Sequence, residues 1–459
     1  MTLSYDTQDT IVAVSTPAGS GAVSLVRICG PDAMRVCRAF LRKKGMEALL
    51  PERTASAVEC RDGEYLLDKA VAVFFKAPRS FSGEDTVEIS CHGSPYITAR
   101  LVDLALRSGA RPAGPGEFTF RAFLNGKLDL SQAEGICDLI AADTAAAHRA
   151  ALGQLEGGIS SKINSFRDSL IQALAEIEAR LDDSYGEIPE LNLPVFTGSL
   201  KKQLENIRNL ASTFIAGRLV KEGIKVSIAG PPNSGKSSLL NRLLDRERAI
   251  VSPLPGTTRD TLEEKTEISG QAVIFMDTAG IRLHAADTIE AEGIKRTLSA
   301  VDASDVILMV TDVSVPADKA DGRAAKIISS RLRPGCTVIH VLNKSDLGVP
   351  AEIPEGALLV SCKTGGGLDK LKRRLAGAGA EAATADNSCV ITSARHHAAL
   401  AEAASELEAA VGTFMDGRAE LEIAALHLRS TLDALESITG RTTAEDILSA
   451  VFGRFCVGK

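Results

Sequence analysis

The stretch Val226-Ser-Ile-Ala-Gly-Pro-Pro-Asn-Ser-Gly-Lys-Ser237 decides the fold of the central part of this chain. It begins with an apolar run, continues in a loop with a glycine at each end, and leads into the helix-forming residues 238–244. A strand, a G-x-x-x-x-G-K-[ST] loop and a helix in this order form a phosphate-binding loop. The stretch therefore predicts a P-loop domain in which parallel strands alternate with crossover helices.

The residue types of this loop fit the phosphates of a nucleotide. Glycines let backbone N–H groups close around the phosphates, and the helix N-terminus adds a favourable dipole. Lys236 would offer a positive charge to the β- and γ-phosphates, and the Ser237 hydroxyl would bind Mg²⁺. A chance loop is the alternative, and it is disfavoured because further nucleotide motifs follow in order.

Two of those motifs fit the γ-phosphate and its metal ion. Asp277-Thr-Ala-Gly280 follows an apolar run, so Asp277 can hold the Mg²⁺ shell while the Gly280 N–H reaches the γ-phosphate. The run Gly256-Thr-Thr-Arg-Asp260 lies where a switch segment belongs, and Thr258 is predicted as the second Mg²⁺ hydroxyl. Ile281 stands where Ras-type enzymes have a water-orienting Gln, so the attacking water must be polarised in another way.

The next two motifs fit guanine. Asn343-Lys-Ser-Asp346 follows the apolar run 337–342, and the Asp346 carboxylate can accept two hydrogen bonds from guanine N1–H and N2–H₂. Adenine lacks that donor pair, and buried hydrogen-bonding sites discriminate strongly. Ser361-Cys-Lys363 follows another apolar run and can offer a backbone N–H to guanine O6. The alternative is that these residues form a polar surface turn without a role in nucleotide binding.

The sequence on either side of this domain has different patterns of apolar residues. Short β-rich runs at Ile11–Val14, 22–28, 70–75 and 86–90, punctuated by Gly and Pro, predict a mixed α/β region. Apolar residues then recur every three or four positions from 159 to 181, which predicts a long helix. Residues 186–194 break that helix, and a second one is expected to run to about residue 220. Helical periodicity returns after residue 380.

Helical sequence on both sides of the P-loop domain indicates one helical domain with that domain inserted. A lone pair of helices buries little core, so insertion is preferred over two separate helical domains. The predicted boundaries are 1–120 for the N-terminal α/β domain, 121–220 and 381–459 for the helical domain, and 221–380 for the P-loop domain.

Composition sets limits on the partners and the compartment. The 459 residues carry a net charge of −7 and only 4% aromatic residues, which argues against a broad basic or stacking surface for nucleic acid but not against a local one. The nine Cys show no CxxC spacing, so reduced thiols in a cytoplasmic protein are expected. No basic segment leads into an apolar one at the N-terminus, and no apolar run reaches about 18 residues, so neither a signal peptide nor a membrane span is predicted.

Taken with their flanks, these motifs resemble one family, the bacterial tRNA modification GTPases called MnmE or TrmE. The likeness extends over nearly the whole chain, through AVSLVRICG from residue 22, FSGEDTVEI from 81 and PGEFTFRAFLNGKLDL from 115. Its most specific parts are the RAFLNGKLDL run and the Cys-x-Gly-Lys end at Cys456–Lys459.

The resemblance implies a fold and a function. The fold is an N-terminal α/β dimerisation domain, an all-α helical domain discontinuous in sequence, and an inserted Ras-like P-loop GTPase domain with a mainly parallel sheet. The function is GTP hydrolysis, in a homodimer that forms a heterotetramer with an FAD- and NADH-using MnmG (GidA) partner. That complex adds a carboxymethylaminomethyl or aminomethyl group to C5 of the wobble uridine of certain tRNAs, with 5-formyltetrahydrofolate or a related tetrahydrofolate as carbon donor. A regulatory GTPase switch of the ribosome-assembly type is the alternative.

The family also implies a K⁺ ion beside the γ-phosphate when two GTPase domains meet, in place of the missing Gln. Asn233, Ser252, Leu254 and Thr257 match its ligands. A cation there would neutralise developing charge much as an arginine finger does. Prolines 253 and 255 depart from the family pattern, and each restricts the residue before it.

Further residues are carried over from the family. Glu290 matches its water-orienting carboxylate, with Glu292 as a rival and a solvated helix face as the bland alternative. The folate site maps onto Arg27, Glu88, Lys127 and Lys459, each of which could instead be an ordinary surface charge or part of an interface salt bridge.

Cys456 is predicted either as a nucleophile activated by a nearby lysine or as a small contact that seats the tail. His396-His397 has no third ligand nearby, so no metal site is expected there. The residues predicted to bind GTP, with those of the K⁺ loop, are Asn233, Ser234, Gly235, Lys236, Ser237, Ser238, Ser252, Pro253, Leu254, Pro255, Gly256, Thr257, Thr258, Asp277, Thr278, Ala279, Gly280, Asn343, Lys344, Asp346, Ser361, Cys362 and Lys363.

Overall fold

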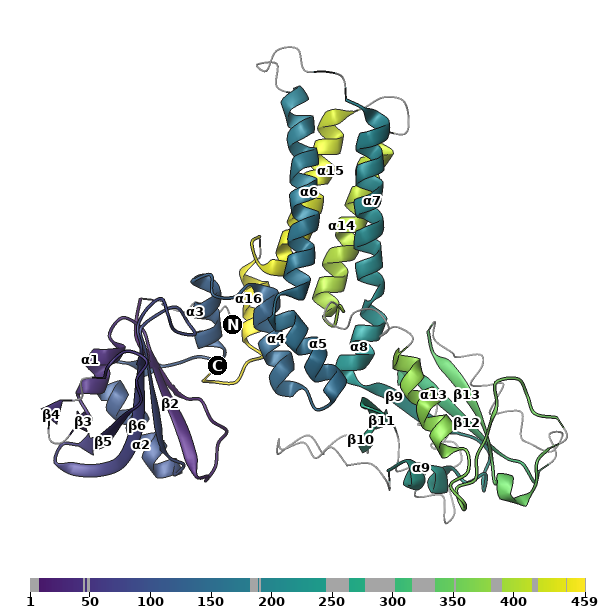
Figure 1. Cartoon of the computed structure of the whole chain (residues 1–459), viewed down its shortest axis with the longest axis horizontal. Helices are drawn as coiled ribbons and strands as arrows, with labels where there is room; N and C mark the ends of the chain where they lie inside the picture. The colour runs from purple at the N-terminus through teal and green to yellow at the C-terminus, as the bar shows by residue number, and fades with distance from the viewer. Residues whose placement is uncertain are drawn as a thin grey trace. The chain divides into compact units, whose positions relative to one another are not determined.

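A computed structural model describes most of the chain (Figure 1). The described residues are 8–43, 46–47, 50–181, 189, 191–244, 264–276, 302–315, 335–350, 352–380, 390–414, 420–442 and 444–458. The chain divides into two compact units: Met1–Cys137, Leu155–Gln172 and Arg429–Lys459 form the first, and Asp138–Gln154 with Ala173–Leu428 forms the second. Each unit is thus assembled from segments far apart in sequence.

The first unit is built around an eight-stranded sheet of order β4-β3-β5-β6-β7-β2-β1-β8. Its only parallel pair is β1 with β8, and all other neighbours are antiparallel. The strands are β1 (Ile11–Val14), β2 (Val23–Cys29), β3 (Leu41–Lys43), β4 (Met46–Glu47), β5 (Ser56–Asp62), β6 (Tyr65–Phe75), β7 (Thr86–His92) and β8 (Arg111–Pro112).

Alternation of side chains along these strands gives the sheet two different faces. Val26, Ile28 and Ile89 point to one face and join a buried core with the helices α1 (Ala33–Arg38) and α2 (Pro95–Arg107). Because successive residues point to opposite faces, Arg27 and Glu88 lie on the other face, directly opposite each other in the β2–β7 register.

Phenylalanine side chains form the core of the helical part of the first unit. The helices α3 (Glu117–Leu124), α4 (Leu130–Ala141) and α16 (Glu445–Phe452) share a core in which the Phe120 and Phe452 rings meet edge to face with centroids 5.1 Å apart. The Phe452 and Phe455 rings stack at 5.7 Å. The last helix of the chain therefore packs on a helix that begins at residue 117.

The second unit contains a six-stranded sheet of order β10-β11-β9-β12-β13-β14. Only β10 and β11 are antiparallel. The strands are β9 (Ile224–Ala229), β10 (Glu264–Ile268), β11 (Gln271–Phe275), β12 (Val306–Asp312), β13 (Thr337–Asn343) and β14 (Leu358–Leu359). Helices α9 (Lys236–Leu244) and α13 (Leu368–Ala380) join the core of this sheet through Leu240, Leu243, Leu371 and Leu375.

The rest of the second unit is helical. It includes α5 (Ala145–Leu155), α7 (Leu193–Ser212), α8 (Phe214–Glu222) and α14 (Ala394–Gly412), while α6 (Gly158–Leu181) and α15 (Leu421–Thr439) contribute to both units. Asn192 caps the start of α7 by accepting a hydrogen bond from the Val195 N–H. The Phe196 ring meets the Phe414 ring edge to face at 5.4 Å, beside α14.

The predicted fold class is confirmed, since an α/β N-terminal part, a helical part and a mainly parallel P-loop sheet are all present. The long helix from 159 is α6, and the helix expected to run to 220 is two helices separated at Thr213. The domain boundaries at 120, 220 and 380 stay predictions. Within the described residues, no helix is both long and apolar enough to cross a membrane.

Candidate functional site

The P-loop requires glycine at both of its ends. Gly230 has φ 148°, and a Cβ there would lie 2.0 Å from the Val310 carbonyl oxygen on β12. Gly235 has φ 93°, and a Cβ there would lie 2.2 Å from the Asn343 Nδ2. Both positions combine a left-handed backbone with backbone or side-chain atoms at very short range, so any side chain would displace the loop.

Lys236 turns its ammonium group back over this loop. Its Nζ donates to the Gly230 carbonyl at 3.0 Å and to the Pro231 carbonyl at 2.8 Å, and burial lowers the pKa of Lys236. The buried Ser234 Oγ has no hydrogen-bond partner among the described residues. A cation whose charge is disfavoured by burial and an unsatisfied hydroxyl fit an incoming phosphate, which would supply the missing negative charge and acceptors.

Asn343 joins the P-loop to the guanine-binding segments. Its Nδ2 donates to the Ser234 carbonyl at 2.9 Å, and its Oδ1 accepts from the Cys362 N–H at 3.4 Å. Next to it, Lys344 adopts φ 64° and pairs with Asp312 at 2.5 Å. The end of β13 is thus tied both to the loop that would hold phosphates and to the loop that would hold the base.

The Asp346 carboxylate is oriented by the second of these loops. Its Oδ1 accepts from the Ser361 hydroxyl at 2.6 Å, and this hydrogen bond holds the pKa of Asp346 below its ordinary value. The Arg242 guanidinium of α9 donates to the Cys362 carbonyl at 2.7 Å and fixes the same loop from the other side. An exposed, ionised carboxylate in a fixed orientation can accept the two N–H groups of guanine.

Several predicted residues lie outside the described part of the chain. These are Ser252, Pro253, Leu254, Pro255, Gly256, Thr257, Thr258, Asp277, Thr278, Ala279, Gly280, Glu290, Glu292 and Lys459. Asn233 is described: its backbone has φ 61° and its side chain is exposed at the tip of the P-loop. The described half of the predicted GTP site, from Asn233 to Ser238 and from Asn343 to Lys363, comes together around the ends of β9 and β13.

The N-terminal sheet carries a second group of predicted residues. The Arg27 Nη2 lies 2.8 Å from the Glu88 Oε1, and both side chains are mostly covered. The Arg27 guanidinium also lies 5.7 Å from the centre of the Phe81 ring and 5.5 Å from that of Phe118. This arrangement combines a hydrogen-bonding carboxylate, a cation and aromatic surface, as a flat heterocycle requires.

A cavity of about 560 Å³ extends this group to Lys127. Its lining residues are Arg53, Phe75, Arg79, Ser80, Phe81 and Lys127. The Lys127 Nζ donates to the Pro78 carbonyl at 3.0 Å, and the Arg53 guanidinium donates to the Arg79 carbonyl at 2.9 Å. The sequence interpretation missed Arg53, Arg79 and Phe81. Phe81 lies in the FSGEDTVEI run and could have been suspected, but no local signal marks the two arginines.

The C-terminal tail is seated beside the same sheet. Val457 forms an antiparallel bridge with Pro115, and the Ser15 hydroxyl donates to the Gly458 carbonyl at 2.9 Å. Cys456 is exposed, whereas Cys29, Cys37, Cys60 and Cys91 are buried with raised thiol pKa values. Among the described cysteines of this unit, Cys456 is the one that is exposed, while Cys137 is half-buried.

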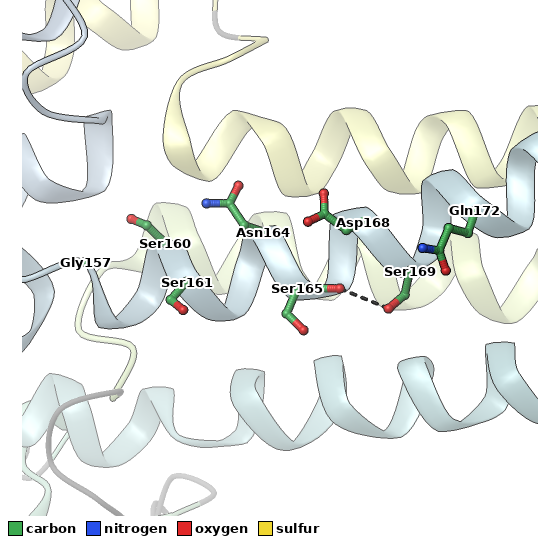
Figure 2. Close-up of a pocket in the computed structure, with 8 residues that line it drawn as sticks. All are labelled: Gly157, Ser160, Ser161, Asn164, Ser165, Asp168, Ser169 and Gln172. Atoms are coloured by element: carbon green, nitrogen blue, oxygen red, sulfur yellow. Dashed lines mark hydrogen bonds between the residues drawn. The ribbon is translucent and has the colours of Figure 1, made fainter.

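His396 is fully buried in α14, and no group of three metal-ligating side chains occurs among the residues that the structure describes. A separate cavity of about 680 Å³ runs along α6 (Figure 2). It is lined by Gly157, Ser160, Ser161, Asn164, Ser165, Asp168, Ser169 and Gln172. Its one carboxylate, Asp168, pairs with Arg167 at 2.9 Å, and none of the predicted site residues lies in it.

A mainly parallel sheet with a P-loop, an Asn-Lys-Ser-Asp segment and a Ser-Cys-Lys loop defines a P-loop GTPase. Comparison with known proteins identifies the particular family. The MnmE helical domain matches residues 130–456, and the GTP-binding protein TrmE N-terminus matches residues 10–127. This chain belongs to the MnmE family of tRNA modification GTPases.

Relatives of similar length support the assignment. The tRNA modification GTPase MnmE of Akkermansia muciniphila is 40% identical over 460 residues, which cover 99% of this chain and 100% of the relative. Those of Geobacter sulfurreducens and Christiangramia forsetii are 40% and 37% identical, each covering 98% of this chain and 99% of the relative. The similarity therefore includes the regions on both sides of the GTPase domain.

Proposed function

We propose that this chain binds GTP with Mg²⁺ at the P-loop, hydrolyses it, and uses the cycle to modify the wobble uridine of certain tRNAs. The observation that carries the proposal is the double role of Asn343, which bonds to Ser234 in the P-loop and to Cys362 in the base loop. One side chain thereby sets the distance between the phosphate and guanine ends of a single nucleotide. Family membership adds the tRNA.

At the phosphate end, Lys236 exchanges its two carbonyl acceptors for phosphate oxygens, and the Ser237 hydroxyl turns to the metal ion. Mg²⁺, when bound, neutralises charge on the β- and γ-phosphates. Asn233, Ser252, Leu254 and Thr257 would hold K⁺, which would supply positive charge in place of the absent Gln. Glu290 orients the attacking water. Asp277 and Thr258 would help to hold the Mg²⁺ ion.

The second part of the proposal concerns a tetrahydrofolate. Glu88 accepts hydrogen bonds from the donor edge of the pterin, whose flat ring lies near Phe81 and Arg27. Lys127, with Arg53 and Arg79 in the adjoining cavity, attracts the carboxylates of the glutamate tail. Lys459 would complete the site from the other end of the chain, since the neighbouring Val457 forms a bridge with Pro115 beside the N-terminal sheet.

The third part concerns assembly. The sheet face that carries Arg27 and Glu88 also exposes Val23 (63%) and Val71 (43%), and uncovered apolar sheet surface favours association. A homodimer through this domain would cover that surface. An FAD- and NADH-using MnmG-type partner supplies the redox chemistry.

The first test is the rate of GTP hydrolysis by the purified chain in K⁺ and in Na⁺ buffer, with Asn233→Ala as the comparison. K⁺ is expected to raise the rate at least about tenfold, and Asn233→Ala to abolish most of that response. A rate that ignores the cation would remove the roles given to Asn233, Ser252, Leu254 and Thr257. Loss of all GTP hydrolysis in both buffers would contradict the proposed activity itself.

A further inference from the structure

Helix α13 presents two contrasting faces. Leu368, Leu371 and Leu375 are buried in the core of the P-loop domain. Lys370, Arg373 and Arg374 are exposed on the opposite side, because residues three and four apart share one face of a helix. We call these three cations the α13 basic face.

Repulsion within the α13 basic face lowers the stability of the helix. Lys370 is three residues from Arg373 and four from Arg374, and like charges at these spacings destabilise a helix by about 0.2–0.5 kcal/mol per pair. None of the three forms an ion pair with a carboxylate of the described residues, and the Arg373 Nε reaches only the Asp369 carbonyl at 3.3 Å. Asp369, four residues before Arg373, is the one carboxylate of the described part of α13, and its side chain forms no ion pair with any of the three cations.

Other cations of the same unit form ion pairs with carboxylates. Lys221 lies 2.7 Å from the Asp138 carboxylate, Lys265 pairs with Asp143, and Arg218 lies 2.6 Å from Asp305. The chain as a whole carries a net charge of −7. Three unneutralised, adjacent cations in an acidic chain form a local site of positive potential, to which a polyanion would be attracted.

We propose that the α13 basic face is a docking surface for the sugar-phosphate backbone of the tRNA substrate. The inference rests on the proposed function, since tRNA is the polyanion that this function requires. Phosphate contacts need only exposed Lys and Arg side chains, and they position a nucleic acid without reading its sequence. The tRNA would thus be held on the GTPase domain, beside the helix that follows the guanine loop Ser361–Lys363.

An acidic protein surface is a less suitable occupant. Protein interfaces normally centre on buried aromatic or apolar side chains with charges at the rim. The described side chains of α13 include no exposed large hydrophobic residue, so the face offers charge without such an anchor. A phosphate backbone, by contrast, binds mainly through charge and needs no apolar surface.

The experiment uses the full chain and measures the affinity for a fluorescent tRNA at several KCl concentrations. The test variant is Lys370→Gln/Arg373→Gln/Arg374→Gln. Its control is Lys201→Gln/Lys202→Gln/Arg208→Gln, which removes three exposed cations from α7, one of them paired with Glu408 at 2.6 Å, and changes the net charge equally. The rate of GTP hydrolysis is recorded for both variants to show that the P-loop domain is folded.

The test variant is expected to bind tRNA at least about tenfold more weakly at low salt, with a plot of log K against log[KCl] about two units less steep, since each released phosphate contact contributes about 0.7–0.9. The control should bind like the original chain, and several different tRNAs should lose affinity equally. Equal affinity and slope in test variant and original chain would overturn the inference and leave an acidic protein as the partner to seek. No tRNA binding by the original chain would overturn the tRNA part of the proposed function as well.

Discussion

At the scale of single residues, the orientation of one carboxylate carries the proposed selectivity for guanine. Asp346 is exposed, yet the hydroxyl of Ser361 fixes it at 2.6 Å and keeps it ionised. The sequence predicts Asp346 and Ser361 as separate motifs, 15 positions apart. It does not predict their hydrogen bond, because that contact depends on how β13 and β14 end side by side in the sheet.

Asp346→Asn is expected to weaken GTP binding roughly 100-fold, because two hydrogen bonds to a charged group at about 1.5 kcal/mol each are lost. An amide can donate where the carboxylate accepted, so xanthosine triphosphate, with a carbonyl at C2, should bind the variant better than GTP. Competition against a fluorescent GDP measures both affinities. The exposed Glu355→Gln is the control, and unchanged GTP affinity in Asp346→Asn would contradict the assigned role.

Ser361→Ala should change the pH dependence of nucleotide binding. Guanine binds the ionised carboxylate, whose pKa lies below 3.8, so the affinity of the original chain falls only as pH drops through that low value. Without the Ser361 hydroxyl the pKa rises towards its ordinary value, so the affinity of the variant should fall at a higher pH. Fluorescent GDP titrations across the acid range measure the midpoint, and identical midpoints would show that Ser361 does not act through Asp346.

At the scale of secondary-structure elements, a buried charge network joins β1, α3 and the loop before β7. Arg121 is fully buried and contacts Asp9 at 2.6 Å, Glu84 at 3.0 Å and Glu117 at 2.9 Å. Burial alone would raise the pKa of Asp9, but hydrogen bonds from Arg111 and Arg121 outweigh it and hold the pKa below its ordinary value. The ionised network therefore fastens elements that are about 100 residues apart in sequence.

Arg121→Met should lower the free energy of unfolding of these elements by about 3–5 kcal/mol, because it leaves buried carboxylates without their cation. Hydrogen exchange of the amides in β1 and α3 should accelerate at least about 100-fold at neutral pH. The difference should shrink in acid, since stability from a depressed Asp9 pKa is present above 3.8 and is lost as pH falls through the lower folded value.

The matched control is Arg35→Met, which removes an exposed ion pair with Asp32 and should change exchange little. Equal effects of the two substitutions would show that the buried network contributes no more than a surface pair.

Elements with strong patterns were predictable from the sequence and elements with weak ones were not. The apolar runs of β9 and β13 are recognisable in the sequence, as is the helical periodicity of α6. The strand β10 reads Glu-Lys-Thr-Glu-Ile and was missed, because an edge strand half in solvent keeps little apolar sequence. The same limit applies to the site: motifs revealed the P-loop, whereas Arg53 and Arg79 share a cavity only through the fold.

At the scale of the whole molecule, both ends of the described chain lie in the first unit (Figure 1). Gly458 has φ 99°, and a Cβ there would lie 2.3 Å from the Val14 carbonyl oxygen, at the end of β1. The tail can therefore lie against the N-terminal sheet only with glycine at this position. The close fit holds the described end of the tail beside β1, where the Ser15 hydroxyl donates to the Gly458 carbonyl.

Gly458→Ala should displace the tail and weaken tetrahydrofolate binding about tenfold, equivalent to losing one charge-assisted contact of about 1.5 kcal/mol. GTP hydrolysis should stay unchanged, since no tail residue is placed in the nucleotide site. Titration of the ligand by fluorescence measures the first effect and phosphate release the second. Gly412→Ala, where a Cβ would meet nothing within 4 Å, is the control. Full folate affinity in Gly458→Ala would separate the tail from that site.

The packing of α16 against α3 also means that the first unit cannot complete its fold until α16 has been synthesised. Residues Met1–Cys137 are synthesised first, but Arg429–Lys459, which complete the same unit, follow roughly 300 residues later. At about 5–20 residues per second, the nascent first unit waits roughly 15–60 s for its final helix. During that interval Phe120 and Phe123 lack Phe452, the ring that later covers them. The first unit therefore exposes hydrophobic surface while the second is being synthesised, and transiently exposed surface of this kind is what chaperones protect from aggregation.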